Sequence, residues 1–402
     1  MTDATLAARF GTPLYVYDQA EIRAAHAALT AALPTPSRLY YSLKANPHPH
    51  VAATLAALGC HAEVSSSGEL TAALEAHFEP ERIMVTGPGK ADGTLDIAMR
   101  HGVHRFSAES PTDLQRIGLA ATRAGVVAQC LLRVNADRVV TGMGLSMTGR
   151  ASQFGVDASW VAAKPAEFRA PGTQVTGLHL YMGTNIPHTD RLIEQFRTSV
   201  TLAADLKGAL DVSEIDLGGG FAAPYAHRGA RPDYPDLADR LTDLLDDHLS
   251  GWRSSAPLVS FEAGRFLVAT SGTLFCTVLD VKPSKGRTFV VLDSGVHHLG
   301  GMSGLRRLPR VIPDLLTTDI RGVERDCVLV GPLCTPLDTW SDGVALPAVR
   351  RGDLVAVPNV GAYGLTASLV AFLGHPAATE VVVDGDRLIS ASRLTLQRIA
   401  VA

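Results

Sequence analysis

The chain has 402 residues, and at about 100–200 residues per domain this length predicts two or three domains. Hydrophobic residues make up 46% of the chain and charged residues 19%, which excludes a mainly disordered protein, and no apolar stretch is long enough to span a bilayer. The net charge of -4, without a basic run, argues against nucleic acid as the main partner.

The first residues, MTDATLAARF, lack the basic and apolar parts of a signal peptide, so we expect a cytoplasmic protein. Five scattered cysteines fit a reducing compartment better than a disulfide framework. The next stretch, GTPLYVYD, is strand-like. Because it precedes the first helix of the alternating region that follows, we expect residues 1–23 to join a β domain formed by the end of the chain.

Between Arg38 and Arg265, short apolar runs alternate with Ala- and Leu-rich stretches of helical spacing. The eight runs are RLYYSLKAN, GCHAEVSSS, RIMVTGPGK, VHRFSAES, VAQCLLRVN, VTGLHLYMGT, EIDLGGGF and LVSFEAGR. Ser66, followed by Glu69, predicts a capping box at one helix start. Eight strands alternating with helices predict an α/β fold, a (β/α)8 TIM-type barrel over residues 24–265.

After Arg265 the pattern changes to strand-like runs broken by turn residues, such as RTFVVLDSG and DLVAVPNVG, with few helical intervals. This pattern predicts a C-terminal antiparallel β domain over residues 266–402. The chain has no CxxC or HExxH motif, so we expect no metal site.

Polar residues at the carboxyl ends of barrel strands are typical of catalytic sites. Lys44 follows the first strand, while Gly218 to Gly220 and Arg265 follow the seventh and eighth. Glycine backbone N–H groups can approach an anion closely, and arginine can bind one with two hydrogen bonds. A lysine opposite a phosphate-binding loop predicts pyridoxal phosphate held as a Schiff base.

Nine motifs in order give the chain a resemblance to the fold-type III pyridoxal-phosphate decarboxylases, the group of diaminopimelate and ornithine decarboxylases. They are YSLKANP, EVSSSGEL, GPGK, SQFG, LHLYMGT, DLGGGF, EAGR, GPLCTPLD and GAYG, and they extend over essentially the whole chain. The resemblance implies an alanine racemase-like barrel, an amino-acid α-decarboxylase and a homodimer with shared active sites. The stretches LKAN, GPGK, QFG and GPLCTP are most similar to the branch that decarboxylates glutamate tethered to an acyl carrier protein in the butirosin pathway.

The resemblance implies roles for single residues. Lys44 is the Schiff-base lysine, Glu262 pairs with the pyridine nitrogen, and Cys334 reaches the substrate across the dimer interface, where we expect it to reprotonate the α-carbon. The remaining candidates for cofactor binding are Glu63, Arg133, His179, Tyr181, Thr184, Gly218, Gly219, Gly220, Gly264, Arg265 and Tyr363. Each motif alone has a simpler structural interpretation, such as a tight turn for the glycines or a core position for Cys334.

Three positions in two motifs depart from the family pattern. Tyr181 and Thr184 stand where the family usually has a ring-stacking histidine and a serine, although a phenol can stack and a threonine can bind phosphate. Thr335 follows Cys334, where members that take diamino acids typically carry an acidic residue for the distal ammonium. A tethered acidic aminoacyl group, in natural-product or antibiotic biosynthesis, is therefore the expected substrate.

Free diaminopimelate, lysine or ornithine is the alternative substrate. A racemase is less favoured, since racemases place a cationic group by the pyridine nitrogen and Glu262 is acidic. The candidate substrate contacts are His297, His298, Arg306, Thr335 and Asp338, and the Gly-rich, basic stretch HHLGGMSGLRRLPR predicts a lip for an acidic carrier protein.

Overall fold

The computed structural model describes residues 3–136, 149, 151–300, 312–319 and 321–400. They form two compact units. The barrel unit comprises Ala25–Ala223 and Pro232–Leu267, and the β unit comprises Met1–Ala24, Pro224–Arg231 and Val268–Ala402. No helix in the described part of the chain is long and apolar enough to cross a membrane.

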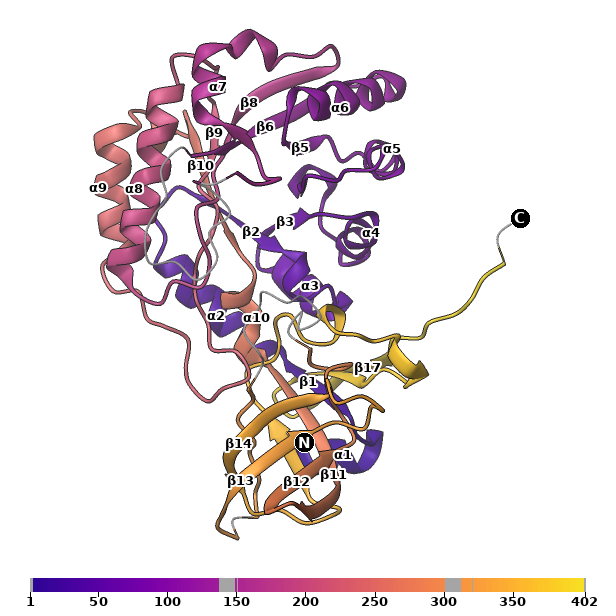
Figure 1. Cartoon of the computed structure of the whole chain (residues 1–402). Coiled ribbons are helices and arrows are strands. Elements are labelled where there is room, and N and C mark those ends of the chain that lie inside the picture. Colours follow the sequence, from indigo (N-terminus) through magenta and orange to yellow (C-terminus); the bar gives the residue numbers. More distant parts are fainter. Residues whose placement is uncertain (1–2, 137–148, 150, 301–311, 320, 401–402) are drawn as a thin grey trace. The chain divides into compact units, whose positions relative to one another are not determined.

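In the described residues, eight parallel strands close the sheet of the barrel unit (Figure 1). They are β2 (Arg38–Ser42), β3 (His61–Val64), β4 (Ile83–Val85), β5 (Arg105–Ala108), β6 (Ala128–Asn135), β8 (Thr173–His179), β9 (Glu214–Asp216) and β10 (Leu258–Ala263). Each pairs with its neighbours in the order β5-β4-β3-β2-β10-β9-β8-β6, and a β5–β6 pairing closes the ring. The short β7 (Val156–Asp157) pairs with the end of β6. The predicted (β/α)8 barrel is confirmed.

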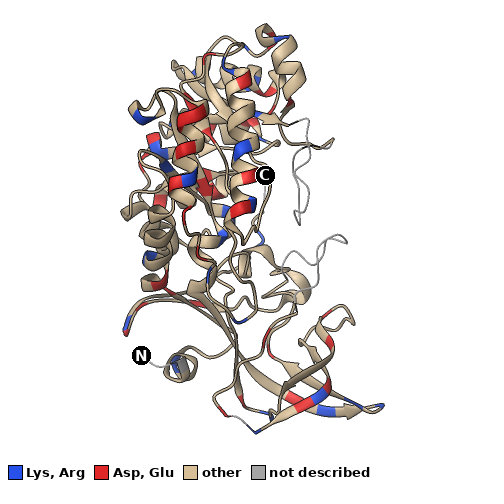
Figure 2. Cartoon of the chain, turned by 90° about the vertical axis from the view of Figure 1, so that its left-hand side faces the viewer, with Lys and Arg blue, Asp and Glu red and all other residues tan. Residues whose placement is uncertain are grey.

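Helices cover the outside of this sheet (Figure 1). They are α2 (Gln19–Ala31), α3 (Pro49–Ala57), α4 (Ser67–Glu75), α5 (Asp92–Arg100), α6 (Pro111–Ala124), α7 (Ala158–Ala163), α8 (Thr189–Leu206) and α9 (Leu237–His248), whereas the four-residue α10 (Arg265–Val268) directly follows β10. Lys, Arg, Asp and Glu are spread along these helices (Figure 2). The leucines of α9, in contrast, are buried, as expected for an amphipathic helix that packs on a sheet.

The predicted cap of α4 is present. Ser66 Oγ accepts a hydrogen bond from Glu69 N at 3.1 Å, and Glu69 Oε2 accepts one from Ser65 N at 2.7 Å. The return bond thus goes to the residue before the N-cap, one position earlier than in a standard capping box. This cap starts the helix that follows β3, the strand that carries Glu63.

The amino end of the barrel is filled by side chains that do not take part in the candidate site. Tyr40, Met84 and Leu131 form an apolar cluster in its interior. Arg105 on β5 forms an ion pair with Glu214 at the start of β9. The opposite, carboxyl end of the strands is where the catalytic loops of such barrels lie.

The β unit contains an eight-stranded sheet within the described residues. Its strands are β1 (Leu14–Asp18), β11 (Gly272–Ser284), β12 (Arg287–Leu292), β13 (Val323–Val330), β14 (Thr339–Pro347), β15 (Leu354–Val357), β16 (Thr379–Asp384) and β17 (Arg387–Arg393). Most pairs are antiparallel, as predicted, but β1 pairs with β16 and β12 with β13 in parallel. Helix α1 (Asp3–Phe10) contributes Leu6 to the core of this sheet, against Leu14 and Phe275.

Candidate active site

Lys44 lies in a short 3-10 turn, Leu43–Ala45, directly after β2. Leu43 and Ala45 are buried, so the turn is anchored on both sides of the lysine. A Cβ added to Gly264 would lie 2.9 Å from the Cβ of Ala45. Glycine at the end of β10 therefore lets this strand approach the lysine turn closely.

Glu63 on β3 holds the Lys44 ammonium. Nζ lies 3.1 and 3.2 Å from the two carboxylate oxygens, and Thr86 donates a 2.8 Å hydrogen bond to the same carboxylate. Burial alone would raise the pKa of Glu63, but the charge of Lys44 and the hydrogen bonds lower it to about 2. The Lys44 side chain is 41% exposed, whereas that of Glu63 is 4% exposed. Glu63 is thus an ionised, buried carboxylate that positions a reachable amine.

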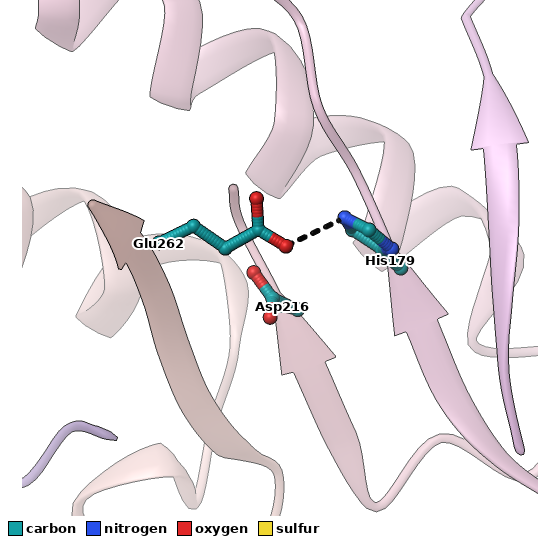
Figure 3. Close-up of side chains that lie close together, drawn as sticks. All are labelled: His179, Asp216 and Glu262. Carbon is teal, nitrogen blue, oxygen red and sulfur yellow. Dashed lines mark ion pairs between the residues drawn. The ribbon is translucent and has the colours of Figure 1, made fainter. Parts of the chain in front are cut away.

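A second cluster joins the ends of three neighbouring strands: His179 of β8, Asp216 of β9 and Glu262 of β10 (Figure 3). His179 Nε2 lies 3.1 Å from Glu262 Oε1, and one ligand atom of each residue lies within 4.8 Å of those of the other two. The His179 and Glu262 side chains are each 1% exposed. His179 Nδ1 is also hydrogen-bonded to Ser107 Oγ of β5 at 2.7 Å, which fixes the plane of the ring.

The charges in this cluster are coupled. Burial alone would lower the pKa of His179, but the adjacent Glu262 raises it. Burial, together with the charge of Glu262, raises the pKa of Asp216 to about 7. The imidazolium and the Glu262 carboxylate therefore offset one another, and the cluster carries a surplus of negative charge whenever Asp216 is ionised.

The glycine loop after β9 lies against this cluster. Asp216 Oδ1 accepts a 2.8 Å hydrogen bond from Gly218 N, and a Cβ at Gly219 would overlap the carbonyl oxygen of Glu262. Ile186 N donates to Gly220 O at 2.8 Å, so the loop after β8, which carries Thr184, runs beside the glycine loop. Gly218 and Gly220 have φ of 70° and 121°, conformations that favour glycine.

Arg133 is paired within the protein. Its guanidinium lies 3.1 Å from Glu109, and it stacks over the rings of Phe154 at 4.7 Å and Tyr181 at 6.0 Å. Glu109 also accepts a 2.6 Å hydrogen bond from Gly155 N. Arg133 therefore helps to position the Tyr181 ring just after β8, and Glu109 compensates its positive charge.

In the β unit, Cys334 is exposed and Asp338 is buried. Both Asp338 oxygens accept hydrogen bonds from backbone N–H groups, of Val296 and of Leu333, each at 2.8 Å. This carboxylate therefore fixes the loop around Cys334, and this arrangement gives no support to the prediction that it contacts the substrate. The Thr335 hydroxyl accepts a 3.3 Å bond from Leu337 N in the same loop.

The predicted pocket histidines are neutral groups. Burial lowers the pKa values of His297 and His298 to about 4. His298 Nε2 contacts the carbonyl oxygen of Pro376 at 2.9 Å, whereas neither ring nitrogen of His297 has a hydrogen-bond partner among the described residues. Tyr363 has a left-handed φ of 53°, and its carbonyl oxygen accepts a 2.8 Å bond from Tyr225. Arg306 lies outside the described residues.

Residues 19–269 match the family described as pyridoxal-dependent decarboxylase, pyridoxal binding domain. The chain belongs to this family. An L-glutamyl-[BtrI acyl-carrier protein] decarboxylase of Niallia circulans is 35% identical over 390 residues, which cover 94% of this chain and 90% of that protein. Diaminopimelate decarboxylase of Aquifex aeolicus is 31% identical over 389 residues, with 94% and 88% covered.

Solved structures agree with this assignment. The crystal structure of diaminopimelate decarboxylase from Helicobacter pylori, complexed with L-lysine, superposes with a TM-score of 0.82 at 25% identity, and the match covers 96% of this chain and 95% of that chain. The chain is therefore a fold-type III decarboxylase of amino acids that depends on pyridoxal phosphate. Both predictions, of cofactor and of enzyme class, are confirmed.

The residues of the decarboxylase fit this cofactor. The surplus negative charge around Glu262 suits a protonated pyridine nitrogen, and the glycine loop offers backbone N–H groups to a phosphate. One buried oxygen of Asp216, Oδ2, has no hydrogen-bond partner among the described residues. Such an oxygen is expected in a site that binds the cationic ring of the cofactor. The cluster also offers ligand types that metals accept, but no fourth His, Cys, Asp or Glu among the described residues joins it.

Two features of the site were missed in the sequence. Asp216 lies at the end of a barrel strand, within the quoted EIDLGGGF run, so the rule that selected Glu262 could have selected it too. Ser107 and Glu109 near the end of β5 carried no motif. Lys90 of GPGK, by contrast, is buried in a 2.7 Å ion pair with Asp113, and this motif therefore stabilises the fold rather than providing a reactive amine.

Proposed function

We propose that the enzyme removes the α-carboxylate of an acidic aminoacyl group that is attached, through its side-chain carboxylate, to the phosphopantetheine of a carrier protein. The relative from Niallia circulans is named for a glutamyl group on an acyl-carrier protein. Attachment as a thioester neutralises the distal carboxylate, so the enzyme needs no charged group to bind it. A homodimer with shared active sites is part of this proposal.

The loop that carries Cys334 supports a neutral distal group. Thr335 has no charge, and its hydroxyl is turned toward the backbone of its own loop. The one carboxylate within GPLCTPLD is Asp338, which is 2% exposed and occupied by two backbone N–H groups. A distal ammonium, as in a free diamino acid, would therefore find no free carboxylate in this loop.

Each site residue has a role in this proposal. Bound pyridoxal phosphate supplies the electron sink for the pair of electrons left when carbon dioxide departs. Lys44 is the amine that would hold the cofactor, Glu63 orients that amine, and the Glu262 carboxylate would accept a hydrogen bond from the ring nitrogen and so keep it protonated. Gly219, Gly220, Thr184 and Arg265 would bind the phosphate, while Gly218, whose N–H is donated to Asp216, would shape the loop, and Tyr181 would stack on the ring. Cys334, which is exposed, would return a proton to the α-carbon.

The test measures carbon dioxide release from two groups of substrates. The first contains free glutamate, aspartate, lysine, ornithine and diaminopimelate, and the second contains glutamyl and aspartyl groups tethered to a carrier protein. We expect kcat/KM for a tethered substrate to exceed that for every free amino acid by at least about a hundredfold, since the carrier adds binding contacts. Higher kcat/KM for a free diamino acid would overturn the proposal and leave the alternative substrate class.

A further inference from the structure

Asp216 contacts both halves of the cofactor site. One carboxylate oxygen accepts a hydrogen bond from Gly218, the first residue of the glycine loop, at 2.8 Å. The other oxygen is buried beside His179 and Glu262 and has no hydrogen-bond partner in the described part of the chain (Figure 3). The residue itself is fully buried, at 0% exposure. No other side chain of the cluster reaches the glycine loop through a hydrogen bond that the described residues show.

A buried carboxylate is costly unless something offsets its charge. His179 faces Asp216 from β8 and Glu262 faces it from β10, so one imidazole serves two carboxylates. When His179 is protonated, its charge cancels that of one carboxylate only. The second negative charge is then available to a cation that arrives at Glu262, and the ring nitrogen of the cofactor is such a cation when protonated.

We propose that Asp216 is a positioning residue of the cofactor site. Its negative charge offsets the positive charge of His179, so that the Glu262 carboxylate remains available to the protonated ring nitrogen. Its hydrogen bond to Gly218 fixes the position of the phosphate loop relative to Glu262. Asp216 acts through Glu262 and the loop, and need not touch the substrate. The inference rests on the cofactor alone, so it can fail without affecting the proposed substrate.

Asp216→Asn tests the charge, because asparagine keeps an oxygen for Gly218 N. Pyridoxal phosphate is removed from the full-length protein, and its rebinding is followed by absorbance and by the rise in Tm. We expect the dissociation constant of the cofactor to increase about tenfold, the change expected for removal of one nearby opposite charge. The Tm of the cofactor-free variant should not fall, since a pair of buried like charges has been relieved, but its rise on cofactor addition should be smaller.

Glu214→Gln is the matched control. Glu214 lies on the same strand, is also buried, and forms its ion pair with Arg105 at the amino end of the barrel. This variant should lower the Tm of the cofactor-free protein and leave the cofactor affinity unchanged. Cofactor affinity of Asp216→Asn within about twofold of wild type, or an equal loss in Glu214→Gln, would overturn the proposal.

A second arm begins with a variant that keeps Asp216. His179→Asn removes the positive charge and leaves both carboxylates, so we expect it to bind the cofactor at least as tightly as wild type. In the double variant His179→Asn with Asp216→Asn, the charges balance again, and its affinity should exceed that of Asp216→Asn alone. A loss of affinity in His179→Asn of more than about tenfold, or additive losses in the double variant, would show that charge offset is not what these residues provide.

Discussion

At the scale of single residues, the Lys44–Glu63 ion pair joins a reachable amine to a buried carboxylate. Glu63 is almost fully buried, whereas Lys44 is 41% exposed at the end of the same ion pair. The buried carboxylate is acceptable only because the lysine compensates its charge. Lys44, the amine proposed to hold the cofactor, therefore also contributes to the stability of the protein before any cofactor binds.

Lys44→Ala should abolish decarboxylation and the covalent label that borohydride fixes in the wild-type enzyme. It should also lower the free energy of unfolding at pH 7 by about 1 kcal/mol, a value kept small because Lys44 is partly exposed. In the wild type the pKa of Glu63 is about 2 in the folded state against an ordinary value of 4.5, so the stability from the ion pair is present above pH 4.5 and is lost as the pH falls from 4.5 toward 2, where the difference between the two proteins should close. Urea unfolding at several pH values measures this.

The control for Lys44→Ala is the double variant with Glu63→Gln. It removes the uncompensated charge, so it should recover the stability lost in the single variant, but it should not recover activity. If the double variant is less stable than Lys44→Ala at pH 7, Glu63 has a structural role that does not depend on its charge.

Thr335→Asp should introduce a carboxylate where the loop has none. If Thr335 selects a neutral distal group, kcat/KM for lysine or diaminopimelate should rise by about tenfold, equivalent to about 1.4 kcal/mol. Leu337→Asp is the control, since Leu337 belongs to the same loop and is 80% exposed. An equal gain in both variants would mean that general loop charge, rather than position 335, affects substrate choice.

At the scale of elements, the position of the turn that carries Lys44 depends on β10, the strand that pairs with β2. Gly264→Ala would place a methyl group 2.9 Å from Ala45 Cβ and 3.3 Å from Ser42 Cβ. We expect the turn to shift, with a loss of cofactor occupancy and a fall in kcat of about tenfold or more, because small displacements of a catalytic group are costly. Gly93→Ala in α5 is the control: nothing lies within 4 Å of its added Cβ, and it should be neutral or slightly stabilising.

Much of the architecture was predictable because it depends on local pattern. Each of the eight barrel strands is a short apolar run, and their ends bring Lys44, Glu63, His179 and Glu262 to one face. β14 was not predicted, because Asp342 and Gly343 interrupt its apolar residues. The parallel pairs were not predictable either, since pairing depends on contacts far apart in sequence. Asp216 ends a barrel strand and could have been selected by the rule that selected Glu262, but its approach to His179 of β8 and Glu262 of β10 depends on the folded sheet and is not visible in a local motif.

At the scale of the whole molecule, we propose that two copies share each active site, with Lys44 and Cys334 supplied by different subunits. Lys44→Ala and Cys334→Ala chains, co-expressed with different tags and purified as the mixed dimer, should then contain one intact site of two. Activity should reach about half that of wild type, well above either parent. Activity no higher than that of the parents would show that both residues come from one chain, or that one of them is dispensable.

The central place of β1 in the sheet of the β unit has a consequence for how the chain folds during synthesis. β1 lies between β11, where Leu14 pairs with Phe275, and β16, where Leu14 pairs with Thr379. Along the chain, β1 is separated from both partners by almost the whole barrel unit, so it cannot pair with them until that long stretch has been made. β10, which closes the barrel beside β2, also emerges late. A nascent chain that has not reached β10 and β11 leaves edges of β2 and β1 unpaired, and we expect such a chain to aggregate unless a chaperone protects it.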